Sequence, residues 1–109
     1  MPRYDKLVRD RIPAIITEGG KACRVERLDQ SEFEKELRLK LQEEMTELIE
    51  AHSGAEVVEE IADVIEVMYA LAALKGASPD EVERVRQRKH AERGGFRDRL
   101  FLLEVKDRG

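Results

Sequence analysis

Two pairs of acidic residues with helical spacing constrain the fold of this chain more than any other feature. Glu44 and Glu47 form the first pair, Glu60 and Asp63 form the second, and twelve residues separate the pairs. Residues three positions apart share one face of a helix, about 60° and ~4.5 Å apart, so each pair directs two carboxylates the same way. If the two helices form an antiparallel hairpin, the four carboxylates converge.

Converging carboxylates require either protons or a cation. Two like charges about 4 Å apart repel by about 4 kcal/mol at an effective dielectric constant near ~20. Glu44 lies within an apolar helical stripe made up of Leu37, Leu41, Met45 and Leu48, and acidic residues are rarely buried unless they are paired or bound to metal. Mg²⁺ or Mn²⁺ is the simplest partner for an all-carboxylate set. The alternative is that these acids form the solvated faces of charged helices.

Length and composition indicate one small helical domain over residues 1–109. Charged residues make up 40% of the chain and aromatic residues 5%, which suits helices with charged outer faces. The net charge of −4 gives no general attraction for nucleic acid. The single Cys23, the absence of a signal-peptide pattern and the lack of a membrane-spanning apolar run lead us to expect a cytoplasmic protein.

Apolar periodicity and capping residues predict two long helices and two shorter ones. The predicted helices cover residues 11–18, 32–51, 55–75 and 79–93. Ser31 and Glu34 have the spacing of a capping box before the first long helix, and Ser78 followed by Pro79 predicts the start of the last helix. The second long helix is apolar over most of its circumference, so we expect another subunit to cover it in a dimer or tetramer.

The sequence patterns of two further segments predict strands. Residues 21–28 alternate between apolar and polar side chains, and residues 96–105 contain a continuous apolar run. Because one strand is not stable alone, we pair the two. The predicted fold is therefore mainly α: a helical bundle with two long antiparallel helices, shorter helices and a small two-stranded β element.

Three motifs resemble a known superfamily. Lys-x-x-Glu-Glu-x-x-Glu-Leu at residues 40–48, followed by Glu-Glu-Ile-Ala-Asp at 59–63, resembles the all-α nucleoside triphosphate pyrophosphatases. Tyr-Asp-Lys-Leu-Val-Arg-Asp-Arg-Ile-Pro at residues 4–13 and Arg-Gly-Gly-Phe at 93–96 resemble its MazG-like branch, often labelled phosphoribosyl-ATP pyrophosphohydrolase-like. The resemblance extends over nearly the whole chain.

The resemblance implies a Mg²⁺-dependent enzyme that converts a nucleoside triphosphate into a monophosphate and pyrophosphate. Carried over by position, the metal ligands would be Glu44, Glu47, Glu60 and Asp63. Lys40, at the head of the motif, would face the phosphates. Either Glu43 or Glu59 would orient the attacking water, and the alternative for both is a carboxylate that is exposed or that only supports a metal ligand.

Separate basic residues must neutralise the phosphates, because the chain has no Gly-x-x-x-x-Gly-Lys-Ser/Thr loop. Lys89 and Arg93 lie one turn apart on the last predicted helix, and Lys6 and Arg9 lie on the opening segment. A plain surface position is the alternative for each of these four residues.

The sequence leaves three hypotheses for function. The first is a house-cleaning pyrophosphatase that removes unwanted nucleoside triphosphates, and the second is the phosphoribosyl-ATP pyrophosphohydrolase of histidine biosynthesis. The third is a non-enzymatic helical oligomerisation module, in which the apolar second helix serves only as an interface. The third hypothesis predicts no dependence on metal.

Overall fold

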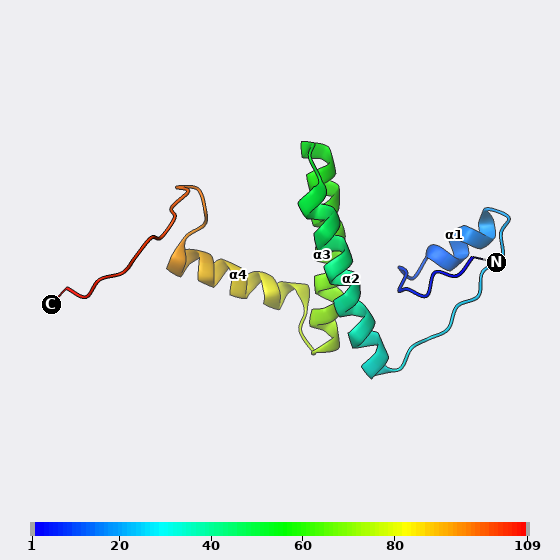
Figure 1. The fold of residues 1–109 in the computed structure, drawn as a ribbon. Coiled ribbons are helices and arrows are strands. Elements are labelled where there is room, and N and C mark those ends of the chain that lie inside the picture. The colour runs from blue at the N-terminus through cyan, green and yellow to red at the C-terminus, as the bar shows by residue number, and fades with distance from the viewer. Residues whose placement is uncertain (1, 109) are drawn as a thin grey trace.

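The structure, a computed structural model, describes residues 2–108 and consists of helices joined by irregular segments (Figure 1). The helices are α1 (Ile12–Glu18), α2 (Gln30–Glu50), α3 (Gly54–Leu74) and α4 (Pro79–Arg93). α2 and α3 pack along their lengths as an antiparallel hairpin, whereas α4 contacts only α3. Within the described part of the chain, no helix has both the length and the apolar character needed to cross a bilayer.

Serine caps fix the starts of α3 and α4. The Ser53 hydroxyl accepts a hydrogen bond from the amide of Glu56 at 3.1 Å, and the Ser78 hydroxyl accepts one from the amide of Glu81 at 3.2 Å. Each bond satisfies an amide that has no partner within the helix, which contributes about 1 kcal/mol. The prediction that Ser78 starts the last helix is confirmed.

Asp29 caps α2, so the predicted capping box at Ser31 is wrong. The Asp29 carboxylate accepts a hydrogen bond from the amide of Glu32 at 2.8 Å, and the helix begins at Gln30. Ser31 therefore lies inside the first turn. Both residue types are good caps, and the earlier of the two lengthens the helix while leaving its apolar stripe in place.

The apolar core lies between α2 and α3 and is small. Among the described residues the buried apolar side chains are Leu37, Val64 and Val67, which are 4%, 8% and 9% exposed. Glu44 is buried with them at 9% exposure. A charged group in so small a core has to be explained by a partner, because an ionised carboxylate is costly to remove from water.

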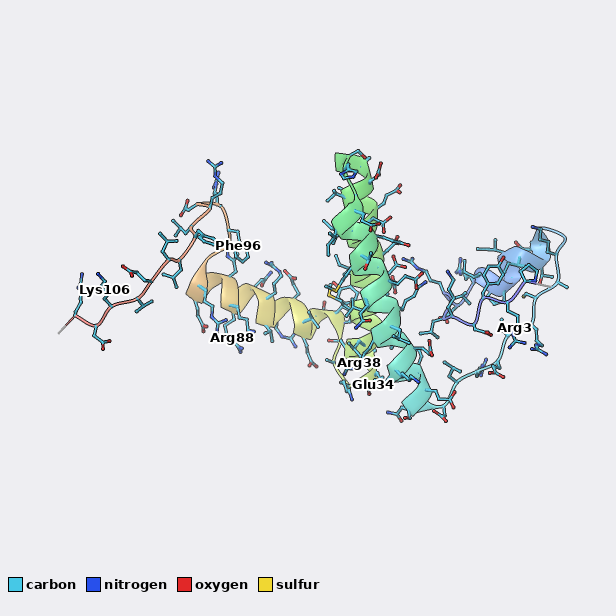
Figure 2. The ribbon with its side chains drawn as sticks, viewed as in Figure 1. Arg3, Glu34, Arg38, Arg88, Phe96 and Lys106 are labelled. Atoms are coloured by element: carbon cyan, nitrogen blue, oxygen red, sulfur yellow. The ribbon has the colours of Figure 1, made fainter. Side chains whose placement is uncertain are left out.

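Charged side chains join the two helices at the open end of the hairpin. Lys75 Nζ donates to Glu34 Oε1 at 2.8 Å, and Arg38 Nη2 donates to Glu34 Oε2 at 2.9 Å. Figure 2 shows Glu34 and Arg38 at this end of α2. The hydrogen bond from Lys75, and then that from Arg38, lowers the pKa of Glu34. The pair of Lys75 with Glu34 is open to solvent, so it defines the register of the hairpin more than it stabilises it, whereas the pair of Arg38 with Glu34 lies within α2.

The predicted two-stranded β element is wrong. Residues 21–28 and 96–105 have no regular structure, and no backbone hydrogen bond joins them. In Figure 1 they lie on opposite sides of the hairpin, and the labelled Phe96 and Lys106 in Figure 2 lie far from α2. A strand needs the backbone of a partner, and the hairpin keeps these two segments apart. The prediction of a mainly α helical bundle fits the structure.

The chain is extended for its length and leaves much apolar surface open. Its radius of gyration is 19.1 Å, whereas a compact domain of this length has a radius of about 13 Å. Its accessible surface is 10286 Å², against about 6,200 Å² for a folded monomer of this mass. The C-terminal segment illustrates the excess, since Leu100 and Phe101 are 89% and 87% exposed.

Candidate metal centre

Three acidic residues of the hairpin bring their carboxylate oxygens together. One oxygen each from Glu44, Glu47 and Glu60 lie within 4.8 Å of one another. The arrangement follows from the sequence, because Glu44 and Glu47 share one face of α2 and the antiparallel α3 places Glu60 opposite them. Hard oxygen ligands at this spacing suit Mg²⁺ or Mn²⁺.

Two oxygens of this cluster are buried without a hydrogen-bond partner among residues 2–108. They are Oε2 of Glu44 and Oε2 of Glu60. Burial, and then the negative charge of Glu47, raises the pKa of Glu44, while Lys40 acts in the opposite direction and Asp63 adds to the increase. An orphaned carboxylate oxygen is costly in a low-dielectric site. A divalent cation among these oxygens would satisfy them and keep Glu44 ionised, so the residues present fit a metal.

Asp63, the fourth predicted ligand, has a different partner. Arg9 Nη2 donates to Asp63 Oδ1 at 2.8 Å, which joins the opening segment to α3. Asp63 is absent from the cluster of three converging acids, although its charge acts on Glu44. The structure thus brings three of the four predicted ligands together and places an arginine on the fourth.

Two lysines lie beside the cluster on its α2 side. Lys40 Nζ lies 3.5 Å from Glu44 Oε1 and 3.9 Å from Glu43 Oε2. Lys6 Nζ lies 3.7 Å from Glu43 Oε1. The Glu43 carboxylate is therefore shared by two ammonium groups, one at each oxygen. It holds positive charge at the edge of the acid cluster.

A cleft of about 280 Å³ lies between the opening segment and the hairpin. Its lining residues are Lys6, Leu7, Val8, Arg9, Ile12, Lys40, Glu44 and Asp63. Sequence reasoning did not single out Leu7 and Val8, whose only signal was their position between two basic residues. Small-molecule sites usually enclose about 300 to 1,000 Å³, so this cleft has room for part of a nucleotide.

Three predicted site residues lie away from the cleft within one chain. The Glu59 side chain is exposed on α3 and makes no hydrogen bond or ion pair with any other residue in the 2–108 range. Lys89 and Arg93 are exposed on α4, which extends away from the hairpin (Figure 1). Arg88, labelled in Figure 2, marks the same helix. These residues are therefore not brought to the acids of their own chain.

The helical hairpin and its acid cluster fit a metal-dependent hydrolase, and comparison with known families is more specific. Residues 20–90 match the sequence model of phosphoribosyl-ATP pyrophosphohydrolase, and the chain belongs to that family. The family is part of the MazG-like all-α nucleoside triphosphate pyrophosphatase superfamily, as the sequence motifs predicted. Its enzymes depend on divalent metal and hydrolyse a pyrophosphate bond of a nucleotide. No curated protein matches the chain, and no solved structure matches it.

Proposed function

We propose that this protein hydrolyses the phosphoanhydride bond between the α- and β-phosphates of a nucleoside triphosphate and requires Mg²⁺ to do so. The products are a nucleoside monophosphate and pyrophosphate. The observation that carries the proposal is the set of converging acids in the hairpin, with orphaned oxygens on Glu44 and Glu60. Basic residues line the cleft beside this set, as a substrate with several negative charges requires.

Glu44, Glu47 and Glu60 would hold the metal, with Asp63 as a further ligand once it is free of Arg9. When bound, the metal would neutralise negative charge on the phosphoryl oxygens and lower the pKa of a water molecule. Mg²⁺ is favoured over softer ions because the donors are all carboxylates, and Mn²⁺ can replace it. The raised pKa of Glu44 is consistent with a site that is built for a cation.

The basic residues of the cleft would bind the polyphosphate. Lys40 lies beside Glu44, and Lys6 and Arg9 approach from the opening segment. Glu43 positions both lysines through its two oxygens. Of the two candidate bases, Glu43 pairs with Lys6 and Lys40, which line the cleft, whereas Glu59 has no such contact. Glu43 is therefore the better supported residue to orient the attacking water.

Two substrate classes use the same bond cleavage. We place nucleoside triphosphates first, because residues 4–13 and 93–96 resemble the MazG-like branch and residues 6–9 line the cleft. Phosphoribosyl-ATP is the second candidate, and the family match over residues 20–90 favours it. Phosphoribosyl-ATP carries a phosphoribosyl group that an ordinary nucleoside triphosphate lacks, and a cleft of about 280 Å³ does not distinguish between the two.

We also propose that the active species is a homo-oligomer, a dimer or a tetramer. The exposed surface of 10286 Å² exceeds that of a compact monomer by roughly 4,000 Å². Obligate interfaces bury about 2,000 to 5,000 Å² in total, so the excess is large enough for one or more of them. Lys89 and Arg93 could contact a phosphate only at the site of another copy.

Substitution of Glu60 tests the proposal. Wild-type protein with Mg²⁺ should release pyrophosphate from at least one member of a panel of nucleoside triphosphates and phosphoribosyl-ATP, with the products identified by mass. Glu60→Ala should lower kcat/KM by at least about 100-fold, since even the loss of an outer partner of a metal ligand often costs 10- to 100-fold. Glu66→Ala, an exposed acid on the same helix, is the matched control and should retain activity.

Two outcomes would contradict the proposal. One is full activity of Glu60→Ala under conditions where the wild type is metal-dependent. The other is the absence of turnover for the whole panel, which would return the non-enzymatic oligomerisation module as the better account. Size-exclusion chromatography of both variants shows whether any loss of activity comes from a change in assembly.

A further inference from the structure

The segment of residues 3–11, here called the opening arm, carries two cations to acids that lie next to the acid cluster. Arg9 Nη2 lies 2.8 Å from Asp63 Oδ1, across 54 positions in the sequence. Lys6 Nζ lies 3.7 Å from Glu43 Oε1. α1, which follows the arm, does not pack along the other helices. The contacts made by Arg9 and Lys6 are therefore the main polar link between the N-terminal part and the hairpin.

The contact of Arg9 with Asp63 gives one acid of the motif a cation from its own chain. The two side chains are 59% and 42% exposed, and ion pairs this open to water are weak and sensitive to salt. A divalent ion carries twice the charge and binds several carboxylates at once. Such an ion can take Asp63 from Arg9 with little loss.

The size of the cleft also argues that the arm moves. Arg9 and Lys6 line one side of a cleft of about 280 Å³, which lies below the range of ~300 to 1,000 Å³ that is usual for small-molecule sites. The cleft has room for only part of a nucleotide while the arm stays on Asp63 and Glu43. The apolar neighbours Leu7 and Val8 line the same cleft, so an arm that closes again would exclude water from the phosphates.

We propose that the opening arm is a cation-bearing cover that exchanges its partner. Arg9 neutralises Asp63 in the metal-free protein. When a divalent ion takes Asp63, the Arg9 guanidinium passes to the phosphate oxygens of the substrate. This inference rests on the proposed function and adds to it a positioning role for Arg9 and an order of events, in which the metal precedes the nucleotide.

The exchange predicts effects of opposite sign on two ligands. Removal of Arg9 takes away a competitor of the metal, so metal should bind more tightly. The same change takes away a phosphate partner, so nucleotide should bind less tightly. A plain surface arginine would change neither affinity, and an arginine that merely holds the arm in its fold would weaken both.

Calorimetric titration with Mn²⁺ in the absence of nucleotide measures the first effect. Arg9→Ala should lower the Kd for Mn²⁺ by about two- to fivefold, the range that corresponds to loss of an exposed ion pair. Arg9→Lys keeps the charge and should stay close to the wild type. Lys6→Ala removes an equal charge from the same arm, but its partner Glu43 is outside the acid cluster, so its effect should be smaller.

Titration with the non-hydrolysable analogue α,β-methylene-ATP, at saturating Mn²⁺, measures the second effect. Arg9→Ala should raise the Kd for the analogue by about tenfold, because a charge-assisted hydrogen bond is lost. An unchanged Kd in this variant, or an equal fall in Mn²⁺ Kd for Lys6→Ala and Arg9→Ala, would overturn the exchange. The second result would show a general effect of charge instead of competition at Asp63.

Limited trypsin digestion reports the position of the arm without any turnover. Mn²⁺ alone should speed cleavage after Lys6 and Arg9, since the arm is released from the acids. Mn²⁺ with α,β-methylene-ATP should slow cleavage below the metal-free rate, since the arm closes on the phosphates. Cleavage after Arg97, in the distant C-terminal segment, is the internal control. Slower cleavage after Arg9 with Mn²⁺ alone would contradict the proposal.

The Glu60→Ala variant separates the failure of this inference from failure of the proposed function. If this variant binds Mn²⁺ as well as the wild type, the acid cluster is not the metal site and both proposals fall. If Mn²⁺ binding requires Glu60 but Arg9→Ala binds Mn²⁺ with unchanged or weaker affinity, only the partner exchange is wrong.

Discussion

The α2–α3 hairpin is held together by its own residues, whereas two segments, one on either side of it, form no regular structure of their own. The hairpin has capped helices, a small core around Leu37 and the acid cluster. Residues 21–28 and 96–105 have suitable strand composition but no regular structure. Helices satisfy their backbone from within, whereas strands depend on the backbone of a partner. To become ordered, these two segments therefore need a partner surface that the hairpin does not provide.

The largest stability effect should separate the core of the hairpin from the C-terminal segment. Leu37 is 4% exposed and Leu102 is 79% exposed. Leu37→Ala should cost about 2 to 5 kcal/mol through loss of packing and a residual cavity. Leu102→Ala should stay within about 0.5 kcal/mol where the segment is solvated. Urea unfolding at low protein concentration measures both variants.

The concentration dependence of the same experiment sharpens the comparison. If an oligomer covers the C-terminal segment, the cost of Leu102→Ala should rise with protein concentration, while that of Leu37→Ala should change less. A larger cost for Leu102→Ala than for Leu37→Ala at every concentration would reverse the comparison. The C-terminal segment would then be the better packed region.

An intermediate effect should distinguish the true cap of α2 from the predicted one. Asp29 accepts the hydrogen bond from the Glu32 amide, so Asp29→Ala should lower the free energy of unfolding by about 1 kcal/mol. Ser31→Ala should stay within about 0.5 kcal/mol, because Ser31 lies inside the first turn. Thermal unfolding of the two variants measures the difference in their stability. Equal losses would mean that the helix start shifts between the two residues.

The smallest effect concerns pH and Glu44 in the absence of metal. Burial, and then the charge of Glu47, raises the folded-state pKa of Glu44. The folded state therefore retains a proton that the unfolded state has released, and stability falls as pH rises from about 4.3 through the raised pKa. In EDTA, Glu44→Gln should remove this slope and be more stable than the wild type near neutral pH.

Glu34→Gln provides a control of opposite sign for the pH experiment. The hydrogen bond from Lys75 lowers the pKa of Glu34, so this residue contributes stability above its unfolded pKa that is lost as pH falls through the lowered value. Its substitution should act on the acidic side of the profile. A steeper fall in stability with rising pH for Glu44→Gln than for wild type would contradict the account of Glu44.

Local signals predicted the helices well. The last helix has the predicted bounds of residues 79–93, and the long helices begin and end within two residues of the expected positions. Spacing alone placed Glu44 and Glu47 on one face of α2. The start of α2 was misassigned because Asp29 and Ser31 are equally suitable caps, and sequence does not rank them.

Long-range relations outside the hairpin were beyond the sequence. The strand pairing was wrong because apolar composition predicts that a segment packs against a partner but does not identify that partner. The contact of Arg9 with Asp63 spans 54 positions, and no periodicity links residues so far apart. Lys89 and Arg93 were grouped with the site by charge, although α4 leads away from the hairpin.

Mn²⁺ binding followed by electron paramagnetic resonance tests the central claim most directly, namely that acids of α2 and α3 together hold a divalent cation. The signal of free Mn²⁺ should fall on addition of wild-type protein and should persist with a Glu44→Gln, Glu60→Gln double variant that remains folded by circular dichroism. An equal fall with both proteins, or none with the wild type, would contradict the account.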